Sequence, residues 1–255
     1  MNVLRLIWSV VFIFTFVVPQ AQAQRLVSKL SVQEISINST FTGGSLSLFG
    51  NVEALLGENG AVRGPFDLIV MIQGPAVDKV VREKSRQMGI WLNAQQVSYS
   101  GAPAYFHLLS TRALSDIADP ALLEELEISL KAQIHGIESP SPEAEILFTN
   151  QLMRLMKEKN IYGTSPHVIS FHSDTFYSAN LDLPSNVPNG TYLATSFLFK
   201  NGELLDRRAE RFFVRTVGME KFIANSARDF PAIYGIATVL LALFTGWFGG
   251  VVFRR

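Results

Sequence analysis

The sequence AIYGIATVLLALFTGWFGGVVF, residues 232–253, decides how this chain is organised. It contains no charged residue and is followed by Arg254 and Arg255. Because an α-helix rises ~1.5 Å per residue, about 20 apolar residues are enough to cross the hydrocarbon core of a bilayer. A helix buried in a soluble core would have to be apolar on every side and lie at the end of the chain. The sequence therefore predicts one transmembrane helix over residues 232–253.

The first 23 residues have the features of a secretory signal peptide. Arg5 provides a short positive region, residues 6–18 are apolar, and Ala21-Gln22-Ala23 is a small-x-small cleavage site. We expect cleavage after this site; the alternative is a retained N-terminal anchor. Cleavage leaves residues 24–231 outside the cytoplasm and the two C-terminal arginines inside it, as the positive-inside rule expects.

Charge and composition narrow the function classes. The chain has 22 basic and 22 acidic residues, and without Arg5, Arg254 and Arg255 the exported part is slightly acidic. A nucleic-acid-binding protein would show a clustered basic excess, so we expect no nucleic-acid partner. The chain has no cysteine, and its exported part is therefore stabilised by its core without disulfides.

Apolar residues with a period of two predict strands before and after a central helical region. Residues 35–50 alternate on both sides of Gly43-Gly44 and predict two half-buried strands joined by a glycine turn. Residues 66–72, FDLIVMI, predict a buried strand, and Asn201-Gly202 predicts a type I′ hairpin turn because both residues tolerate positive φ. Other extended segments are expected at residues 90–92, 97–99, 105–109, 167–171, 175–183, 191–199 and 211–217.

Two helix starts interrupt this β pattern. Asp119-Pro120 and Ser141-Pro142 each place an N-cap residue before a proline at the first helical position, and Gly163 is expected to end the second helix. The expected fold is mainly β with a helical insertion at about 119–160: an immunoglobulin-like β-sandwich and one C-terminal transmembrane helix. Two small β-rich modules beside a helical pair are the alternative. The expected domains are a signal peptide at 1–23, an exported β-rich domain at 24–218, a juxtamembrane linker at 219–231, the transmembrane helix at 232–253 and a cytoplasmic end at 254–255.

Few residues suggest catalysis or metal binding. A metal site without cysteine needs histidine and carboxylate ligands, and the histidines are His107, His135, His167 and His172. His172 and Asp174 share one face of an extended strand, but two ligands do not form a site. The chain has no G-x-S-x-G motif, and Ser173 between these two residues is no triad, because triads assemble in space. We therefore expect no metal, no cofactor and no catalytic residue.

A basic run, DKVVREKSR at residues 78–86, is a candidate anion site. If the run is helical, Lys79, Arg82 and Arg86 lie on one side and suit an oxyanion such as sulfite, sulfate or phosphate. Two alternatives stay open: a solvated helix face, or an extended chain in which this spacing has no meaning.

Small residues recur every four positions in the predicted membrane helix. Thr238, Ala242, Gly246 and Gly250 form a continuous ridge, and the last two are a G-x-x-x-G pair. In lipid no hydrophobic force drives helices together, so close approach along small residues becomes a main source of affinity. The ridge predicts packing on a membrane-protein partner or on a second copy of the chain.

Several motifs together resemble a known family. They are GPFDLIVMIQGP at 64–75, VREKSRQMGIWLN at 81–93, YFHLLSTRAL at 105–114, LPSNVPNGTY at 183–192 and SFLFKNG at 196–202, followed by the terminal apolar helix. From about residue 30 to residue 255 the chain is similar to the alphaproteobacterial putative transmembrane protein family. The resemblance implies a bacterial inner-membrane protein with a periplasmic domain and no assigned catalytic residues. It also implies sulfite-exporter-type transporters as genomic neighbours.

These observations favour a non-catalytic, single-pass periplasmic accessory or binding protein, held in lipid by its C-terminal helix and possessing a membrane-protein partner such as a sulfite-exporter-type transporter. A periplasmic sensor or binder of an anion or solute is the first alternative. A membrane-anchored hydrolase is the second, disfavoured by the missing nucleophile motifs.

Overall fold

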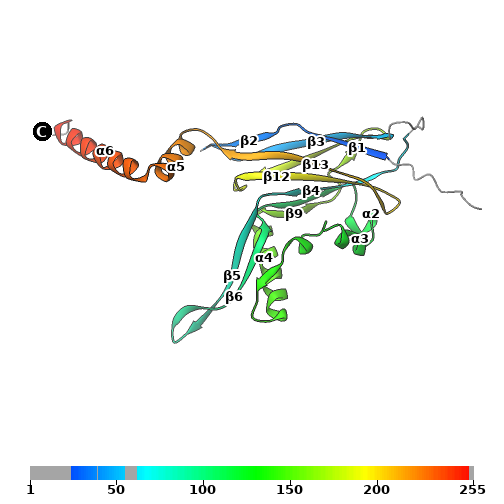
Figure 1. Ribbon diagram of the computed structural model, residues 1–255, viewed down its shortest axis with the longest axis horizontal. Helices are drawn as coiled ribbons and strands as arrows, with labels where there is room; N and C mark the ends of the chain where they lie inside the picture. Colours follow the sequence, from blue (N-terminus) through cyan, green and yellow to red (C-terminus); the bar gives the residue numbers. More distant parts are fainter. Residues whose placement is uncertain (1–23, 39, 55–61, 253–255) are drawn as a thin grey trace, which may run out of the picture.

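The computed structural model describes residues 24–38, 40–54 and 62–252. The predicted signal peptide and the two C-terminal arginines lie outside these residues. Strands dominate from residue 24 to residue 216, and two helices follow at the C-terminal end of the chain (Figure 1). The prediction of a mainly β protein with one C-terminal apolar helix is confirmed. We call residues 24–217 the β domain.

Two sheets form the body of the β domain. The first has the order β1-β3-β11-β10 and is antiparallel throughout. The second has the order β2-β13-β12-β4-β7-β9, in which the β13/β2 and β7/β9 pairs are parallel. The strands of the first sheet are β1 Gln24–Leu30, β3 Gly43–Ala54, β10 Ser170–Phe171 and β11 Phe176–Pro184. The strands of the second are β2 Glu34–Ile37, β4 Asp67–Gln73, β7 Phe106–Ser110, β9 Tyr162–Ser165, β12 Gly190–Lys200 and β13 Glu203–Thr216.

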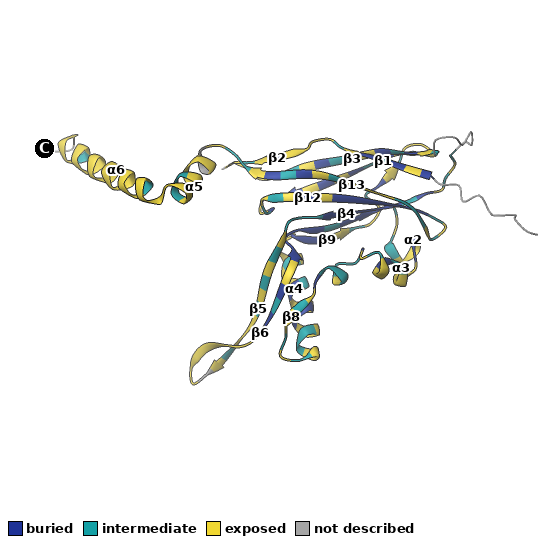
Figure 2. Ribbon diagram, viewed as in Figure 1, coloured by how far each residue is buried: buried dark blue, intermediate teal, exposed yellow. Residues whose placement is uncertain are grey.

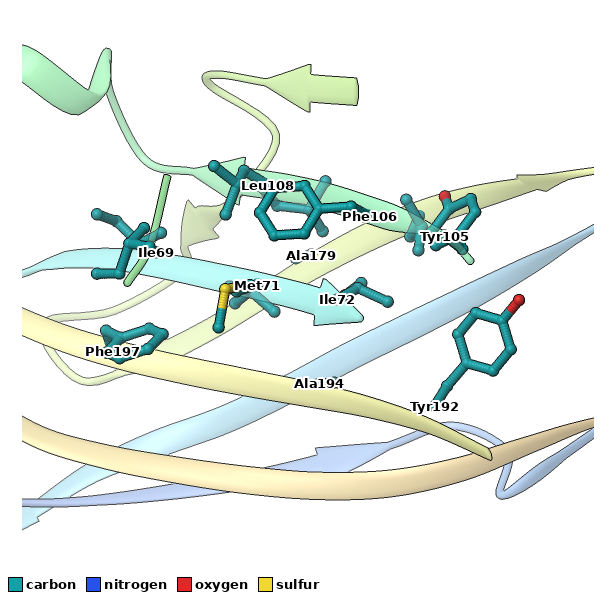
Figure 3. Close-up of a cluster of buried hydrophobic side chains, with 14 of the residues drawn as sticks. Ile69, Met71, Ile72, Tyr105, Phe106, Leu108, Ala179, Tyr192, Ala194 and Phe197 are labelled. Carbon is teal, nitrogen blue, oxygen red and sulfur yellow. The ribbon is translucent and has the colours of Figure 1, made fainter. Parts of the chain in front are cut away.

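One hydrophobic core joins the two sheets. The central residues of β4 are buried on both faces, as its unbroken apolar sequence predicts. Side chains from β4, β7, β11 and β12 lie in one buried cluster, among them Ile69, Phe106, Ala179 and Phe197 (Figure 3). Burial is concentrated in these strands, whereas the C-terminal helices are almost wholly exposed (Figure 2).

Two features support the immunoglobulin-like assignment, which stays a prediction. The sheet orders β1-β3-β11-β10 and β13-β12-β4 match the A-B-E-D and G-F-C strand orders of that fold. Tyr192, near the start of β12, is fully buried, and its hydroxyl donates a hydrogen bond of 2.6 Å to the carbonyl of Pro188. A tyrosine that bonds back to the corner between the fifth and sixth strands is a recurrent feature of such sandwiches.

The helical insertion begins at the two predicted caps. The side chain of Asp119 accepts a hydrogen bond from the Ala121 amide, and that of Ser141 accepts one from the Ala144 amide. The prediction that Gly163 ends the second helix is wrong: the helix ends at Glu158, and Gly163 lies in β9. The insertion and the segment before it contain α2 Leu114–Ile117, α3 Pro120–Glu125, the 3₁₀ turn η1 Lys131–Gln133, β8 Gly136–Glu138 and α4 Pro142–Glu158.

The two predicted glycine turns have different outcomes. Asn201 and Gly202 have φ values of 54° and 88° and join β12 to β13, which confirms the type of turn expected there. The hairpin predicted around Gly43-Gly44 is wrong, because β2 pairs with β13 and β3 pairs with β1 and β11. The chain crosses from one sheet to the other between β2 and β3.

A third, smaller sheet extends from the body of the β domain. Its order is β5-β6-β8, with β5 spanning Ala76–Gln87 and β6 spanning Ile90–Pro103. The short extended segments predicted at residues 90–92 and 97–99 are therefore parts of one long strand. The β5–β6 hairpin projects well beyond the rest of the β domain (Figure 1).

The chain ends in two helices. The segment predicted as a juxtamembrane linker contains α5, Met219–Asp229, and the predicted membrane helix is α6, Pro231–Val252. Within the described residues, α6 is the one helix long and apolar enough to cross a membrane, with a mean hydropathy of 1.9 and no buried residue.

Candidate functional site

The outer end of the β5–β6 hairpin carries an exposed apolar tip. Met88 and Gly89 form the turn with φ values of 49° and 86°, as a two-residue hairpin turn requires. Met88 is fully exposed, Trp91 is 67% exposed and Ile90 is 60% exposed. Leu92 is also exposed. We call residues 88–92 the hairpin tip. Such a cluster on a thin hairpin has no packing role among the residues that the structure describes.

Basic side chains lie next to the tip, on the outer part of β5. Arg82, Lys84 and Arg86 are exposed, and Glu83 is the acidic residue among them. Arg82 donates a hydrogen bond of 3.1 Å from Nε to Oε1 of Gln96 on β6. None of the ion pairs found among the described residues includes one of these three cations. The stem of the hairpin therefore presents an excess of positive charge to solvent.

The structure separates the three residues of the predicted anion site. The basic run is a strand, so the helical interpretation is wrong, and residues three apart on a strand face opposite ways. Arg82 and Arg86 are exposed on the hairpin, whereas Lys79 is partly buried, with Nζ 3.8 Å from Sδ of Met156 and 5.9 Å from the ring centre of Tyr162. Burial, followed by repulsion from Lys159, lowers the pKa of Lys79 below its usual value.

The four small residues of the predicted ridge all lie on α6 and are exposed. A Cβ atom added to Gly246 or Gly250 would meet no atom within 4 Å, so this side of the helix is open to a neighbour. The hydroxyl of Thr238 donates a hydrogen bond of 2.8 Å to the carbonyl of Gly235 in the same helix. Packing on another helix stays a prediction for these four residues, Thr238, Ala242, Gly246 and Gly250.

An apolar groove of about 620 Å³ lies in the angle between α5 and α6. On α5 it is lined by the exposed Phe222 and Ile223, which lie on one side of that helix, and the exposed Phe230 lines it directly after α5 ends. Lys221 and Arg228 lie on the opposite side of α5. A short helix with one apolar and one basic side is suited to the interface between lipid and water.

Within the described residues, the histidines do not assemble into a metal site. Among residues 24–38, 40–54 and 62–252, no group of three or more histidine, aspartate or glutamate side chains is placed to hold a metal ion. His107 is packed beside Tyr105, its Nε2 is 2.9 Å from Oγ of Ser165, and burial lowers its pKa. The Nε2 of His172 is 2.7 Å from Oγ of Ser178. The first contact joins β7 to its neighbour β9, and the second joins the residue after β10 to β11.

Two of these features were missed by the sequence interpretation, namely the hairpin tip and the amphipathic α5. A signal for the tip was present, since Met88-Gly89 separates a basic run from the apolar residues of IWL. A signal for α5 was the helical spacing of Phe222, Ile223 and Ser226.

The fold and the exposed α6 together define a membrane protein of mainly β structure with one candidate C-terminal span. Sequence comparison agrees and is more specific. The chain belongs to the family described as "Putative transmembrane protein (Alph_Pro_TM)", which matches residues 25–255. A search of the curated proteins finds no match to the chain.

Proposed function

We propose that this protein is a non-catalytic, single-pass accessory protein of the bacterial inner membrane. Its β domain lies in the periplasm, α6 crosses the bilayer, and the C-terminus lies in the cytoplasm. The small-residue ridge of α6 docks on a helix of a polytopic membrane protein, for which a sulfite-exporter-type transporter is our first candidate. The observation that carries this proposal is α6 itself, which is wholly unburied and has an open ridge on one side.

The orientation rests on charge. Arg254 and Arg255 directly follow the apolar stretch 232–253, and positive residues next to a membrane helix favour the cytoplasmic side. The predicted cleavage site after Ala23 places the start of the β domain on the opposite side. A reporter active only in the periplasm, fused after Arg255, should be inactive; an active reporter would reverse the proposed topology.

Placing larger side chains on the ridge should abolish the association of α6 with another helix. We expect the Gly246→Ile, Gly250→Ile variant to lose at least about 90% of its co-purified membrane partner in mild detergent, because close backbone approach is blocked. The matched control is Leu240→Ile, Phe244→Ile, which places the same side chain on the opposite side of α6 and should retain the partner. Recovery of the chain alone, as a dimer sensitive to the glycine changes, would indicate that the ridge binds a second copy. Equal recovery of partner by both variants would refute a role for the ridge.

An anion binder is the second candidate function. The observation that favours it is the environment of Lys79, whose charge is partly buried and close to Lys159, while no ion pair of Lys79 is found among the described residues. A bound oxyanion would relieve that repulsion.

The variant Lys79→Met distinguishes the two candidate functions. Because the charged form of Lys79 is disfavoured by burial, methionine should raise the melting temperature by up to about 3 °C, measured by circular dichroism near pH 7. The destabilisation by the buried charge of Lys79 applies fully below the folded-state pKa of this residue and disappears as the pH rises through the usual lysine range. The difference in melting temperature between variant and wild type should therefore shrink at high pH. The control Arg82→Met changes an exposed cation and should leave the melting temperature unchanged. If sulfate stabilises the wild type but not Lys79→Met, the anion function gains support.

A further inference from the structure

We propose that the hairpin tip, residues 88–92, is a second membrane contact of this protein. It enters the headgroup region of the leaflet from which α6 emerges, while the basic stem of β5 binds the phosphates of anionic phospholipids. This inference depends on α6 being in a membrane, but not on what the ridge of α6 binds.

The side chains of the tip are suited to a membrane interface. Met88, Ile90, Trp91 and Leu92 are all exposed at the end of a two-stranded hairpin, where nothing else in the described chain covers them. Tryptophan is enriched at membrane interfaces because its ring is apolar while its N–H needs a polar partner. An apolar cluster of this kind favours transfer from water to the boundary between headgroups and acyl chains.

The charge beside the tip is complementary to anionic lipid. Arg82, Lys84 and Arg86 directly precede the tip in the chain, and Glu83 is the single acid among them. Basic residues beside an inserted apolar segment are attracted to the negative surface potential of anionic lipids. The order matters, since a hairpin that enters with its tip first brings these cations to the depth of the phosphates.

The hairpin and the C-terminal helices leave the β domain in different directions. In Figure 1 the tip of the β5–β6 hairpin lies at the lower left of the view, and α5 and α6 lie at the upper left. The amphipathic α5 carries Phe222 and Ile223 on one side and Lys221 on the other, as expected of a helix lying on a bilayer surface.

A membrane fits this surface better than a protein partner does. The tip is narrow and convex, and the charged groups beside it are mainly the exposed cations Arg82, Lys84 and Arg86, with Glu83 as the one acid among them. A fluid surface of anionic headgroups matches such a contact without requiring shape complementarity. A protein partner is the competing outcome, and the experiment below separates the two.

The test uses the fluorescence of Trp91 in the full chain. The chain has three tryptophans, and Trp8→Phe with Trp247→Phe leaves Trp91 alone. The protein is reconstituted into vesicles of phosphatidylcholine, with or without phosphatidylglycerol, that contain lipids brominated near the headgroup end of the acyl chains. With phosphatidylglycerol we expect a blue-shifted emission and about threefold stronger quenching of Trp91, and both effects should weaken with salt.

Two variants serve as controls. Arg82→Gln, Lys84→Gln, Arg86→Gln should lose the dependence on phosphatidylglycerol, while Gly246→Ile, Gly250→Ile should keep it, so failure of the ridge and failure of the tip are distinguishable. Unchanged circular dichroism spectra would confirm that both variants fold. Emission of Trp91 typical of water in both kinds of vesicle would overturn the proposal. A blue shift seen only in native membranes would also overturn it and would assign the tip to a protein partner.

Discussion

Replacing Gly50 by alanine is expected to destabilise the β domain by about 3 kcal/mol or more, the largest effect we expect from so small a change. Gly50 lies in the middle of β3 and is paired with Ser28 of β1 on one side and Tyr177 of β11 on the other. The buried Tyr177 side chain passes over this glycine, and its hydroxyl is 2.5 Å from Oγ of Ser28. A Cβ atom at position 50 would overlap the carbonyl oxygen of Val27 and lie 2.5 Å from the Tyr177 hydroxyl.

The strands around Gly50 cannot relieve this overlap without a large cost in free energy. The nearest atom belongs to the backbone of β1, so a side chain at position 50 must displace that strand from the sheet or expel the ring of Tyr177. Thermal melts of the full-length protein in detergent, followed by circular dichroism, should show a melting temperature lowered by about 10 °C.

A second glycine of the same strand is the matched control. A Cβ atom on Gly44 would lie 3.4 Å from the ring of Phe41, which is an ordinary contact, and Gly44→Ala should leave the melting temperature nearly unchanged. If Gly50→Ala melts like the wild type, the pairing of β3 with both β1 and β11 at this register is incorrect.

The elements that could be predicted from sequence are those with a local signal. Asn201-Gly202 determines its own backbone conformation, and so do the caps Asp119 and Ser141, whose side chains bond to amides two or three residues away. The apolar run of β4 has no interpretation in a globular domain other than a buried element. In each case the physical cause lies within a few residues, so distant parts of the chain need not be known.

The pairing of strands could not be predicted in the same way. Residues 35–50 have the alternation of two strands, but that pattern is equally compatible with strands in one sheet or in two. The partners of β2 and β3 are β13, β1 and β11, and only the closed core determines that choice. For the same reason the sequence predicts a helix end at Gly163, although this residue lies in β9, where a Cβ atom would overlap the ring of His107.

The β5–β6 hairpin could not be predicted from the sequence for a different reason. In β5 the exposed residues Arg82, Glu83 and Lys84 are consecutive, so neither face of the strand is apolar and no period of two appears. Charged residues are also depleted in ordinary strands. A hairpin that is exposed on both faces gives no burial signal in its sequence. Its unusual composition is understandable if it is selected for contact with a charged surface rather than for packing.

Charging the centre of α6 is expected to release the protein from the membrane. Each arginine near the middle of a membrane helix costs about 2.5–3.5 kcal/mol, so Leu240→Arg, Phe244→Arg together should cost about 5–7 kcal/mol. Both residues are exposed on the side of α6 opposite the small-residue ridge, so the change acts through the lipid and not through a helix partner. The variant should pass into the supernatant on extraction of membranes with alkaline carbonate, whereas the wild type should stay in the pellet. The control Val251→Arg, Val252→Arg adds the same charge beside Arg254, where long side chains reach the headgroups, and should remain bound. Carbonate resistance of the central variant would show that α6 does not lie in the bilayer core, and the membrane contacts of α5 and the hairpin tip would lose their common anchor.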